Sequence, residues 1–376
     1  MAKHPVVVYG ASGYTGMLTM DWLIDQDIPF TAVARNAKRT EEMMRQRVVR
    51  LESARYEIVE CAHDVASLAQ AFRGAKVVCN TVGPFVRFGL EAVEAALKAG
   101  CHHLDTTGEQ SYILDARERF GAAYAQAGLV LAPSTSYMYT LSEIAAELAL
   151  ETNGVDALET VSLSRGPRAS AGITVGSTAS IFEMYRATER FLWDNALVEH
   201  EKHKGFEVSV PEMLLPVFCL PWGGTSLPVF FERDPRVRHC YSLVGFYDNP
   251  AMRMVASLGQ KWDAEYSKLP KAHQDAVLQQ IVSSTTPSMP PRERTTLNRS
   301  IDIAIGRGQL SSVRAVVHSI TPYIATGALQ AAAVLKLLDG EFARAGFASA
   351  CQAFGHRYLL GFLEQRGLAR ASVTAA

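Results

Sequence analysis

The chain has 376 residues, a formal net charge of −1 at pH 7 and 48% hydrophobic residues, values typical of a globular protein long enough for two domains. It shows no basic face, arginine-rich run or RNA-binding signature, so we exclude nucleic acid as a partner. Charge, proline or glycine interrupts each apolar stretch well before the roughly 18 residues of a membrane span. Residues 1–5 lead directly into a strand pattern, which leaves no room for a signal peptide.

The first predicted elements form a strand, a turn and a helix. Residues 6–9 are Val-Val-Val-Tyr, and the helical pattern of residues 17–24 follows glycines spaced three apart. Such a turn directs backbone N–H groups and the positive end of a helix dipole at one point, which suits a pyrophosphate. The spacing departs from the commoner G-x-G-x-x-G because a serine holds the middle position. The predicted dinucleotide-binding residues are Gly10, Ser12, Gly13, Tyr14, Thr15 and Gly16. The alternative is that the glycines only permit a tight turn and close helix packing.

A second strand pattern at residues 30–34 completes a βαβ unit, and Arg35 follows it. NAD is usually held by an acid about twenty residues beyond the glycines, and NADP by an arginine that meets the 2′-phosphate. No Asp or Glu lies between residues 30 and 40, while Lys38 and Arg39 add positive charge. We therefore predict NADP(H) as the cofactor, held by Arg35 and Lys38. The alternative is that Arg35 is only a solvated side chain after a strand.

Strand and helix patterns alternate up to about residue 133, which predicts a parallel sheet covered on both faces. Further strands are predicted at residues 56–61, 76–81, 103–105 and 129–131, and helices at 65–72, 89–99 and 111–127. Asp64 follows the third strand. It either lies near the adenine or caps the next helix.

The pattern becomes mixed between about residues 156 and 319. Strands are predicted at 159–165, 229–231, 237–244, 300–306 and 311–318, and helices at 177–196, 251–266 and 271–282. Proline, glycine and aromatic residues predict a long loop or lid over 208–235, and 285–291 is a second loop. Two helices follow at 323–338 and 356–366.

We predict an α/β fold in which an N-terminal Rossmann-type parallel sheet is joined to a second, mixed α+β domain, with C-terminal helices returning to the first domain. The predicted NADP-binding domain comprises residues 1–135 and 320–376, and the mixed second domain comprises residues 136–319.

The cysteines and histidines predict no metal site. Cys61, Cys79, Cys101, Cys219, Cys240 and Cys351 form no C-x-x-C pair. They are expected to be reduced, buried small residues of a cytoplasmic protein. The ten histidines form no H-E-x-x-H or similar motif.

Three motifs in order carry a family resemblance: residues 9–16 (Tyr-Gly-Ala-Ser-Gly-Tyr-Thr-Gly), 80–85 (Asn-Thr-Val-Gly-Pro-Phe) and 103–109 (His-Leu-Asp-Thr-Thr-Gly-Glu). Together they resemble the saccharopine dehydrogenase-like oxidoreductases, including the trans-acting enoyl reductases. The resemblance covers roughly the first 135 residues and returns weakly at residues 323–326. It implies an N-terminal Rossmann domain, a mixed-sheet substrate or dimer domain, and terminal helices that return to the Rossmann face.

The second and third motifs follow buried strands, so they lie at the carboxyl edge of the sheet, where α/β proteins bind ligands. The predicted cofactor contacts there are Thr81, Val82, Gly83, Pro84, Phe85 and Thr107. The Gly83–Pro84 turn can border a nicotinamide ribose, or it is a plain loop. Glu109 is either a carboxylate of the site or a helix-capping acid.

One stretch departs from the family. Many relatives follow the strand at 129–131 with a glycine-aromatic-aspartate-serine stretch ending in a proline and an aspartate, whereas here Met138, Leu141 and Glu143 replace the first acid, the proline and the later aspartate. The replacement is more apolar and adds two phenols, which suits a bulky hydrophobic substrate. We predict Tyr137 or Tyr139 as hydrogen-bond donor and proton source. The alternative is that both are core or interface residues.

Other candidates are weaker. Arg165, before Gly166-Pro167-Arg168, could grip a carboxylate, and aromatic residues could line a pocket: Trp193, Trp222, Phe230, Phe231, Tyr241 and Phe246. No G-x-S-x-G elbow supports hydrolase chemistry.

The sequence thus predicts a cytoplasmic NADP(H)-dependent oxidoreductase that reduces a C=C bond conjugated to a carbonyl. The expected substrate is a small molecule that is bulky and hydrophobic. Two alternatives remain open. One is a saccharopine-type imine or amino-acid dehydrogenase, and the other is a non-catalytic NADP-binding sensor, scaffold or membrane-associated module. We also predict a homodimer whose interface lies in the second domain.

Overall fold

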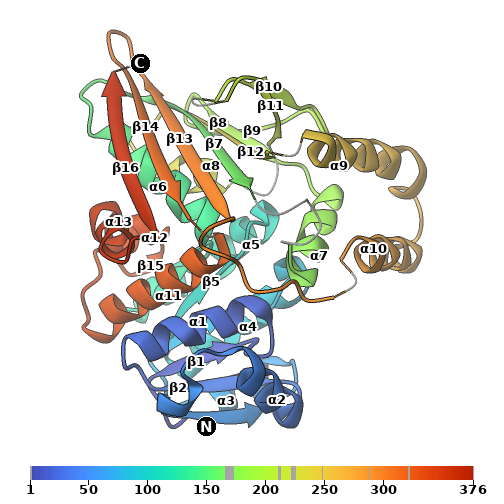
Figure 1. The fold of residues 1–376 in the computed structure, drawn as a ribbon, viewed down its shortest axis with the longest axis vertical. Helices are drawn as coiled ribbons and strands as arrows, with labels where there is room; N and C mark the ends of the chain where they lie inside the picture. Colours follow the sequence, from blue (N-terminus) through green and yellow to red (C-terminus); the bar gives the residue numbers. More distant parts are fainter. Residues whose placement is uncertain are drawn as a thin grey trace. The chain divides into compact units, whose positions relative to one another are not determined.

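The computed structural model describes residues 2–165, 173–210, 213–221, 226–247, 249–286, 288–320 and 322–375. The chain divides into two units. Unit 1 comprises Met1–Thr107, Tyr112–Thr140 and Tyr323–Leu368, and unit 2 comprises Gly108–Ser111, Leu141–Pro322 and Ala369–Ala376. Unit 1 therefore joins the blue N-terminal part of the chain to red C-terminal helices (Figure 1).

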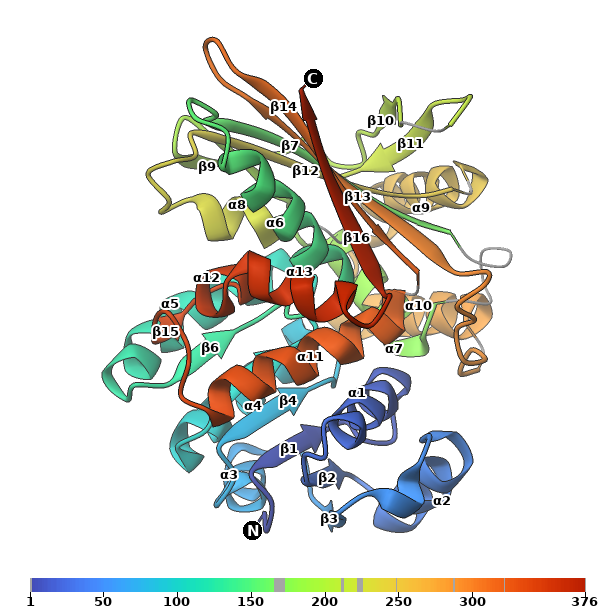
Figure 2. The same cartoon turned by 60° about the vertical axis from the view of Figure 1, so that its left-hand side comes forward.

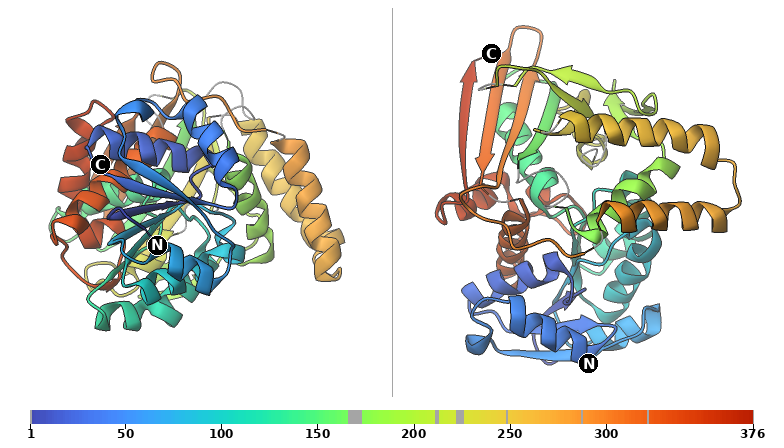
Figure 3. Two further views of the ribbon diagram at one scale, coloured as in Figure 1. Left: turned by 90° about the horizontal axis from the view of Figure 1, so that it is seen from below. Right: turned by 45° about the vertical axis from the view of Figure 1, so that its right-hand side comes forward.

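The sheet of unit 1 is parallel, with the strand order β15-β6-β5-β4-β1-β2-β3. The strands are β1 (Val6–Tyr9), β2 (Phe30–Ala34), β3 (Tyr56–Glu60), β4 (Val77–Asn80), β5 (His102–Asp105), β6 (Val130–Ala132) and β15 (Gly346–Phe347). The left view of Figure 3 shows the blue strands twisted across one another, as expected of a parallel sheet. The predicted Rossmann-type sheet is confirmed.

Helices accompany these strands close to the predicted positions. They are α1 (Tyr14–Asp25), α2 (Ala37–Arg47), α3 (Val65–Phe72), α4 (Phe85–Ala99) and α5 (Gln110–Gln126), with the 3-10 turn η1 (Leu51–Ser53) after α2. The C-terminal helices are α11 (Pro322–Leu338), α12 (Ala350–Phe354) and α13 (His356–Glu364).

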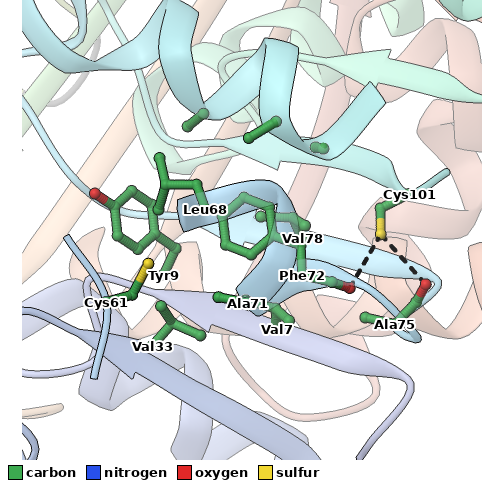
Figure 4. Close-up of a cluster of buried hydrophobic side chains, with 13 residues drawn as sticks. Val7, Tyr9, Val33, Cys61, Leu68, Ala71, Phe72, Ala75, Val78 and Cys101 are labelled. Carbon is green, nitrogen blue, oxygen red and sulfur yellow. Dashed lines mark hydrogen bonds between the residues drawn. The ribbon is translucent and has the colours of Figure 1, made fainter. Parts of the chain in front are cut away.

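A hydrophobic cluster fills one face of this sheet (Figure 4). Val7 and Tyr9 are two residues apart in β1, so their side chains lie on the same face of the sheet. There they pack against Leu68 and Phe72 of α3. The Cys101 S–H group is shared between two carbonyl oxygens at and just after the C-terminal end of α3, those of Phe72 at 3.6 Å and Ala75 at 3.2 Å. Because a parallel sheet is covered on both faces, a central strand such as β1 is a continuous apolar run, Val-Val-Val-Tyr, that is buried at every residue. That is why the sequence pattern located it.

The C-terminal helices pack on unit 1, as the sequence predicted. A Cβ at Gly327 of α11 would lie 2.5 Å from the carbonyl oxygen of Leu18 in α1, so this glycine permits the two helix backbones to approach closely. Arg366 Nη2 donates to Gln26 Oε1 at 2.9 Å. Figure 1 shows α1 and α11 side by side.

Unit 2 contains a mixed sheet with the path β10-β11-β12-β7-β13-β14-β16, joined through β12 to the β8–β9 hairpin. Its strands are β7 (Ala157–Arg165), β8 (Arg190–Trp193), β9 (Ala196–Glu199), β10 (Phe206–Val208), β11 (Val217–Leu220), β12 (His239–Phe246), β13 (Arg299–Arg307), β14 (Ser312–Ser319) and β16 (Ala369–Ala375). The β7–β12 pair is parallel, and β13 and β14 pair antiparallel. Figure 2 shows β13, β14 and β16 running together. The predicted mixed α+β architecture is confirmed.

The helices of this part are α6 (Tyr137–Leu150), α7 (Val175–Glu183), η3 (Met184–Arg186), α8 (Ser226–Phe231), α9 (Asn249–Lys261), η4 (Trp262–Tyr266) and α10 (Lys271–Thr285). Alternation along β13 separates two environments. Ile301 and Ile303 enter an apolar cluster with residues of β7 and β11, whereas Asp302 points to the opposite face, where Ser142 of α6 reaches it.

The single helix predicted over residues 177–196 is wrong. The helix ends with α7 and η3, and β8 and β9 then form a hairpin. Its two turn residues, Asp194 and Asn195, have φ of 47° and 61°. Positive φ at both central positions is typical of the I′ turn that joins two-residue hairpins, and Asp and Asn tolerate that conformation.

The strand predicted at residues 229–231 is also wrong, because these residues belong to helix α8. A short, fully buried apolar run does not distinguish a strand from a helix. The region 208–235, predicted as a long loop, contains β11 and α8 among its described residues.

The C-terminus differs from the predicted domain assignment. Residues 369–376 belong to unit 2 rather than to the Rossmann unit. The physical reason is that β16 pairs antiparallel with β14 along its length, from Ala369 opposite Ser319 to Ala375 opposite Val313.

Candidate functional site

The turn between β1 and α1 is packed so closely that side chains would not fit. Gly10 has φ +91°, and a Cβ there would lie 2.6 Å from Thr81 Oγ1. A Cβ at Gly16 would lie 2.5 Å from the Gly10 carbonyl oxygen. The N–H of Gly13 donates to the same oxygen at 2.8 Å, and a Cβ at Gly13 would lie only 3.1 Å from it. The three predicted glycines therefore each have a structural reason in this turn.

The same turn leaves the start of α1 open. Gly13 occupies the N-cap position, where no side chain of the described residues caps the helix, and the first turn contains no acidic residue. The first helical hydrogen bond runs from Met17 N to Gly13 O at 3.0 Å. The preceding N–H groups have no acceptor within the helix. Together with the helix dipole they form a site for a negatively charged group.

This turn lies where the strand order reverses. β1 is flanked by β2 on one side and β4 on the other, and in such sheets ligands bind at the carboxyl ends of the strands at this switch point. Thr81 follows β4 and donates both its N–H and its Oγ1 hydroxyl to the Tyr9 carbonyl, at 2.9 and 3.0 Å. The structure therefore brings the second motif against the glycine turn.

The rest of the second motif leads into α4. Val82 N donates to Asn80 Oδ1 at 3.0 Å. The Gly83–Pro84 peptide is cis, and Pro84 is the N-cap of α4. Thr81 to Pro84 are half-buried, whereas Phe85 is buried.

Asp105 organises the neighbouring strand ends. Its Oδ1 accepts hydrogen bonds from the N–H groups of Thr107 at 3.0 Å and Ser134 at 3.1 Å. Its Oδ2 accepts one from the Tyr112 hydroxyl at 2.7 Å and lies 3.4 Å from His103 Nε2. Thr107 was predicted to contact the cofactor. In the structure it is completely buried within this hydrogen-bond network. Glu109 is also buried and directly precedes α5.

The two predicted catalytic tyrosines lie in the first turn of α6. Tyr137 is 6% exposed, and its N–H donates to Thr326 Oγ1 at 3.0 Å. Tyr139 is half-buried. Residues two apart on a helix do not share a face, so at most one of these phenols can point to any given ligand.

The predicted phosphate-binding cations lie at the end of β2 and the start of α2. Arg35 and Lys38 are exposed and, within the described residues, form neither an ion pair nor a side-chain hydrogen bond. Sequence reasoning missed a carboxylate beside them. Glu60 Oε2 accepts a hydrogen bond from Ala37 N at 2.9 Å. The signal was available, because the parallel register places Glu60 opposite Ala34, directly before Arg35.

Asp64 caps α3. Its side chain accepts a hydrogen bond from Ser67 N at 2.9 Å. This bond, together with a further one from the Ser67 side chain, lowers the pKa of the Asp64 carboxyl. Of the two predicted roles, the structure provides the capping contact, and a contact to adenine stays a prediction.

The weaker candidates do not gather at one place. Arg165 stacks over Tyr247 at 5.9 Å, and residues 166–168 lie outside the described residues, as does Trp222. Trp193 is 55% exposed beside the hairpin turn, whereas Phe230 and Phe231 are buried in α8. The remaining two differ again: the Tyr241 hydroxyl contacts His200 Nδ1 at 2.8 Å, and Phe246 packs at the edge of the apolar cluster of α7, α9 and α10.

Three general features bear on the site's chemistry. All six cysteines lie in the described residues, are buried and form no disulfide bond, as predicted. In the same part of the chain, no group of three or more His, Cys, Asp or Glu side chains is arranged to hold a metal ion. None of the described helices combines the length and apolarity needed to cross a bilayer.

Comparison with protein families gives a match to DUF5938, a family of unknown function, over residues 140–376. The chain belongs to this family. The N-terminal part of this DUF5938 protein, residues 2–104, matches the NmrA-like family.

Two curated proteins are similar to part of this DUF5938 protein. A lipid droplet localized protein of Caenorhabditis elegans is 32% identical over 136 residues, which cover 34% of this chain and 32% of that protein. A trans-acting enoyl reductase of Mycobacterium ulcerans is 32% identical over 127 residues, which cover 34% of this chain and 30% of that protein. The match thus spans about a third of the length of these curated relatives. It confirms the predicted resemblance.

A solved structure covers nearly the whole chain. Saccharopine dehydrogenase (L-Glu forming) from Saccharomyces cerevisiae aligns over 99% of this chain and 100% of its own, with a TM-score of 0.63 and 11% sequence identity. This likeness confirms the predicted fold.

Proposed function

We propose that this chain is an NADP(H)-dependent oxidoreductase that reduces a C=C bond conjugated to a carbonyl in a bulky hydrophobic substrate. The observation that carries the proposal is the uncapped start of α1 behind a glycine turn, at the point where the strand order reverses. The name of the Mycobacterium ulcerans relative supports the enoyl reductase assignment.

The residues of the glycine turn fit a dinucleotide. Its diphosphate would lie against the start of α1, because the positive end of the helix dipole behind the glycine turn favours a negatively charged group there. The space that a Cβ would fill at Gly10 is taken by Thr81. Hence the loop after β4 would border the cofactor on one side, with Val82, Gly83 and Pro84 nearest the ribose.

Charge at the end of β2 supports NADP over NAD. The 2′-phosphate would meet Arg35 and Lys38, whose cationic groups are exposed and unpaired within the described residues. Glu60 acts against this preference, since its carboxylate lies at the start of α2. Two cations outweigh one carboxylate, so the net field still favours an additional phosphate.

Bound nicotinamide supplies hydride to an electron-poor carbon of the substrate. The chain's own task is then to exclude water, orient the substrate and stabilise the oxygen on which negative charge develops. Tyr139, half-buried at the start of α6, is the better-placed proton source of the two tyrosines, because Tyr137 is almost fully enclosed. The apolar Met138 in place of the family's acid supports a hydrophobic substrate.

The test combines binding and turnover. The wild-type protein should oxidise NADPH, followed by its absorbance, in the presence of at least one hydrophobic enone such as trans-chalcone. Arg35→Ala should weaken NADPH binding roughly tenfold, as expected for one charge-assisted contact at an exposed site, while NADH binding changes little. Arg45→Ala is the matched control, because Arg45 lies on α2 but pairs with Glu41.

Equal losses for both cofactors in Arg35→Ala would refute the choice of NADP. NADPH binding without oxidation on any enone or imine would instead favour the non-catalytic sensor. A cytoplasmic location also belongs to this proposal and is supported by six buried cysteines that form no disulfide bond. A homodimer stays a prediction that analytical ultracentrifugation can test.

A further inference from the structure

Two buried serine hydroxyls lie at the start of α6 without a hydrogen-bond partner among the described residues. They are Ser134 Oγ and Ser136 Oγ, and the residues are only 2% and 5% exposed. Buried hydroxyls are almost always hydrogen-bonded, so each unsatisfied one requires an explanation, such as a bound group.

Ser136 occupies the N-cap position of α6 but does not cap the helix. The first helical hydrogen bond runs from Thr140 N to Ser136 O at 2.9 Å. A serine in this position ordinarily accepts a bond from the second or third helical N–H. Here the side-chain oxygen accepts none. The Ser136 N–H donates instead to Ser134 O at 2.8 Å and to Thr140 Oγ1 at 3.2 Å, so the buried hydroxyl is left without a partner among the described residues, beside the positive end of the helix.

The backbone that carries these hydroxyls is fixed from outside the loop. Three side chains hold residues 134–137, namely Asp105, Thr326 and Gln330, at 3.1, 3.0 and 2.6 Å. Ser134 also has φ +60°, a conformation that serine adopts uncommonly. The loop is therefore held in a disfavoured shape while its two hydroxyls remain unused, which is typical of a binding loop.

The chemistry of the site favours a neutral acceptor oxygen. Two O–H donors and a helix N-terminus supply partial positive charge, shielded from water, which stabilises an oxygen that carries partial or developing negative charge. We propose that Ser134 and Ser136 bind a carbonyl oxygen. Its source is either the conjugated carbonyl of the substrate or the carboxamide of the nicotinamide ring. This inference rests on the proposed function, because both sources are ligands of the reductase.

The test removes each hydroxyl and measures binding without turnover. Ser136→Ala removes one donor, and Ser134→Gly removes the other while suiting the positive φ. Ser300→Ala is the matched control, since Ser300 Oγ is also buried without a partner, in β13. Calorimetry gives dissociation constants for NADPH, for 2′,5′-ADP, which lacks the nicotinamide, and for trans-chalcone added to protein saturated with NADP⁺.

Each variant should bind the ligand that supplies the carbonyl roughly five- to tenfold more weakly, as expected for one lost hydrogen bond. Its thermal unfolding midpoint should be no lower than that of the Ser300→Ala control. If the carboxamide is the ligand, NADPH affinity falls and 2′,5′-ADP affinity does not. If the substrate is the ligand, only chalcone affinity falls. Unchanged affinities for all three ligands, or a drop in midpoint showing that Ser136 caps the helix, would overturn the proposal. A wild-type protein that binds no NADPH would instead refute the cofactor assignment itself.

Discussion

A buried carboxyl group should make the stability of unit 2 depend on pH. Asp302 is fully buried in β13, and its Oδ1 accepts hydrogen bonds from Ser142 Oγ at 3.2 Å and Ser162 Oγ at 2.5 Å. Its Oδ2 has no partner in the described part of the chain. Burial raises the pKa of this carboxyl to about 8, although the two serine hydroxyls lower it in part. At neutral pH the folded protein therefore keeps Asp302 protonated.

The sign of the effect follows from proton binding. An unfolded aspartate ionises near pH 3.9, whereas folded Asp302 holds its proton until about pH 8. The stabilisation is complete below the lower value and is lost as pH rises through this window. One pKa unit corresponds to about 1.4 kcal/mol, so unfolding should cost up to about 4 kcal/mol less at pH 8 than at pH 5 from this group alone. Asp302→Asn keeps an acceptor for both serines, does not titrate, and should remove this contribution.

Urea unfolding at pH 5, 6, 7 and 8, followed by tryptophan fluorescence, provides the assay, because Trp262 is buried in the core of unit 2. The difference in free energy of unfolding between Asp302→Asn and wild type should grow steadily with pH. Glu159→Gln is the control, since Glu159 is an exposed carboxylate on the adjacent strand β7. The same pH dependence in Asp302→Asn as in the wild-type protein would refute the reasoning.

Two further substitutions test the proposed cofactor site. Gly16→Ala places a Cβ 2.5 Å from the backbone carbonyl of Gly10, which cannot move aside, so differential scanning calorimetry should show a lower midpoint, and NADPH binding should weaken at least tenfold. The control is Gly361→Ala, where a Cβ meets nothing within 4 Å, so this change should be neutral or stabilising. Equal effects of Gly16→Ala and Gly361→Ala would contradict this account of the turn. Glu60→Gln removes the charge of the carboxylate that accepts a hydrogen bond from Ala37 N. The change should raise NADPH affinity a few-fold and leave NADH affinity unchanged. A parallel rise in NADH affinity would show that Glu60 does not face the 2′-phosphate.

The Rossmann part was predictable from sequence because its signals are local. Strands buried on both faces are continuous apolar runs, and glycines mark the turn that follows β1. The predicted bounds of β2 and α3 agree with the structure at every residue. The glycine positions also carried functional information, since Gly10 and Gly16 are each required by a contact that a Cβ would block.

Unit 2 was less predictable because its strands depend on distant partners. β16 pairs with β14, although about fifty residues separate them in the chain. Nothing in the short, mixed run 369–375 indicates that partner. The β8–β9 hairpin was missed because its apolar residues also fit a helical pattern, and only the positive φ of Asp194 and Asn195 distinguishes the two.

The candidate site divides in the same way. The glycine turn and the motif after β4 were located by sequence, whereas the serines at the start of α6 were not, because a hydroxyl is recognised as unpartnered only in three dimensions. Ser134 gave no sequence signal for its positive φ. The capping role of Asp64 was likewise established only by its hydrogen bond to Ser67 N, and its contact to adenine stays a prediction.

A crystal structure of the chain grown with NADP⁺ tests the central claim most directly. The diphosphate should lie at the start of α1, within hydrogen-bond distance of backbone N–H groups in its first turn, with the 2′-phosphate beside Arg35. A nucleotide bound elsewhere on the chain, or no bound nucleotide at a saturating concentration, would contradict the assignment of this turn as the cofactor site.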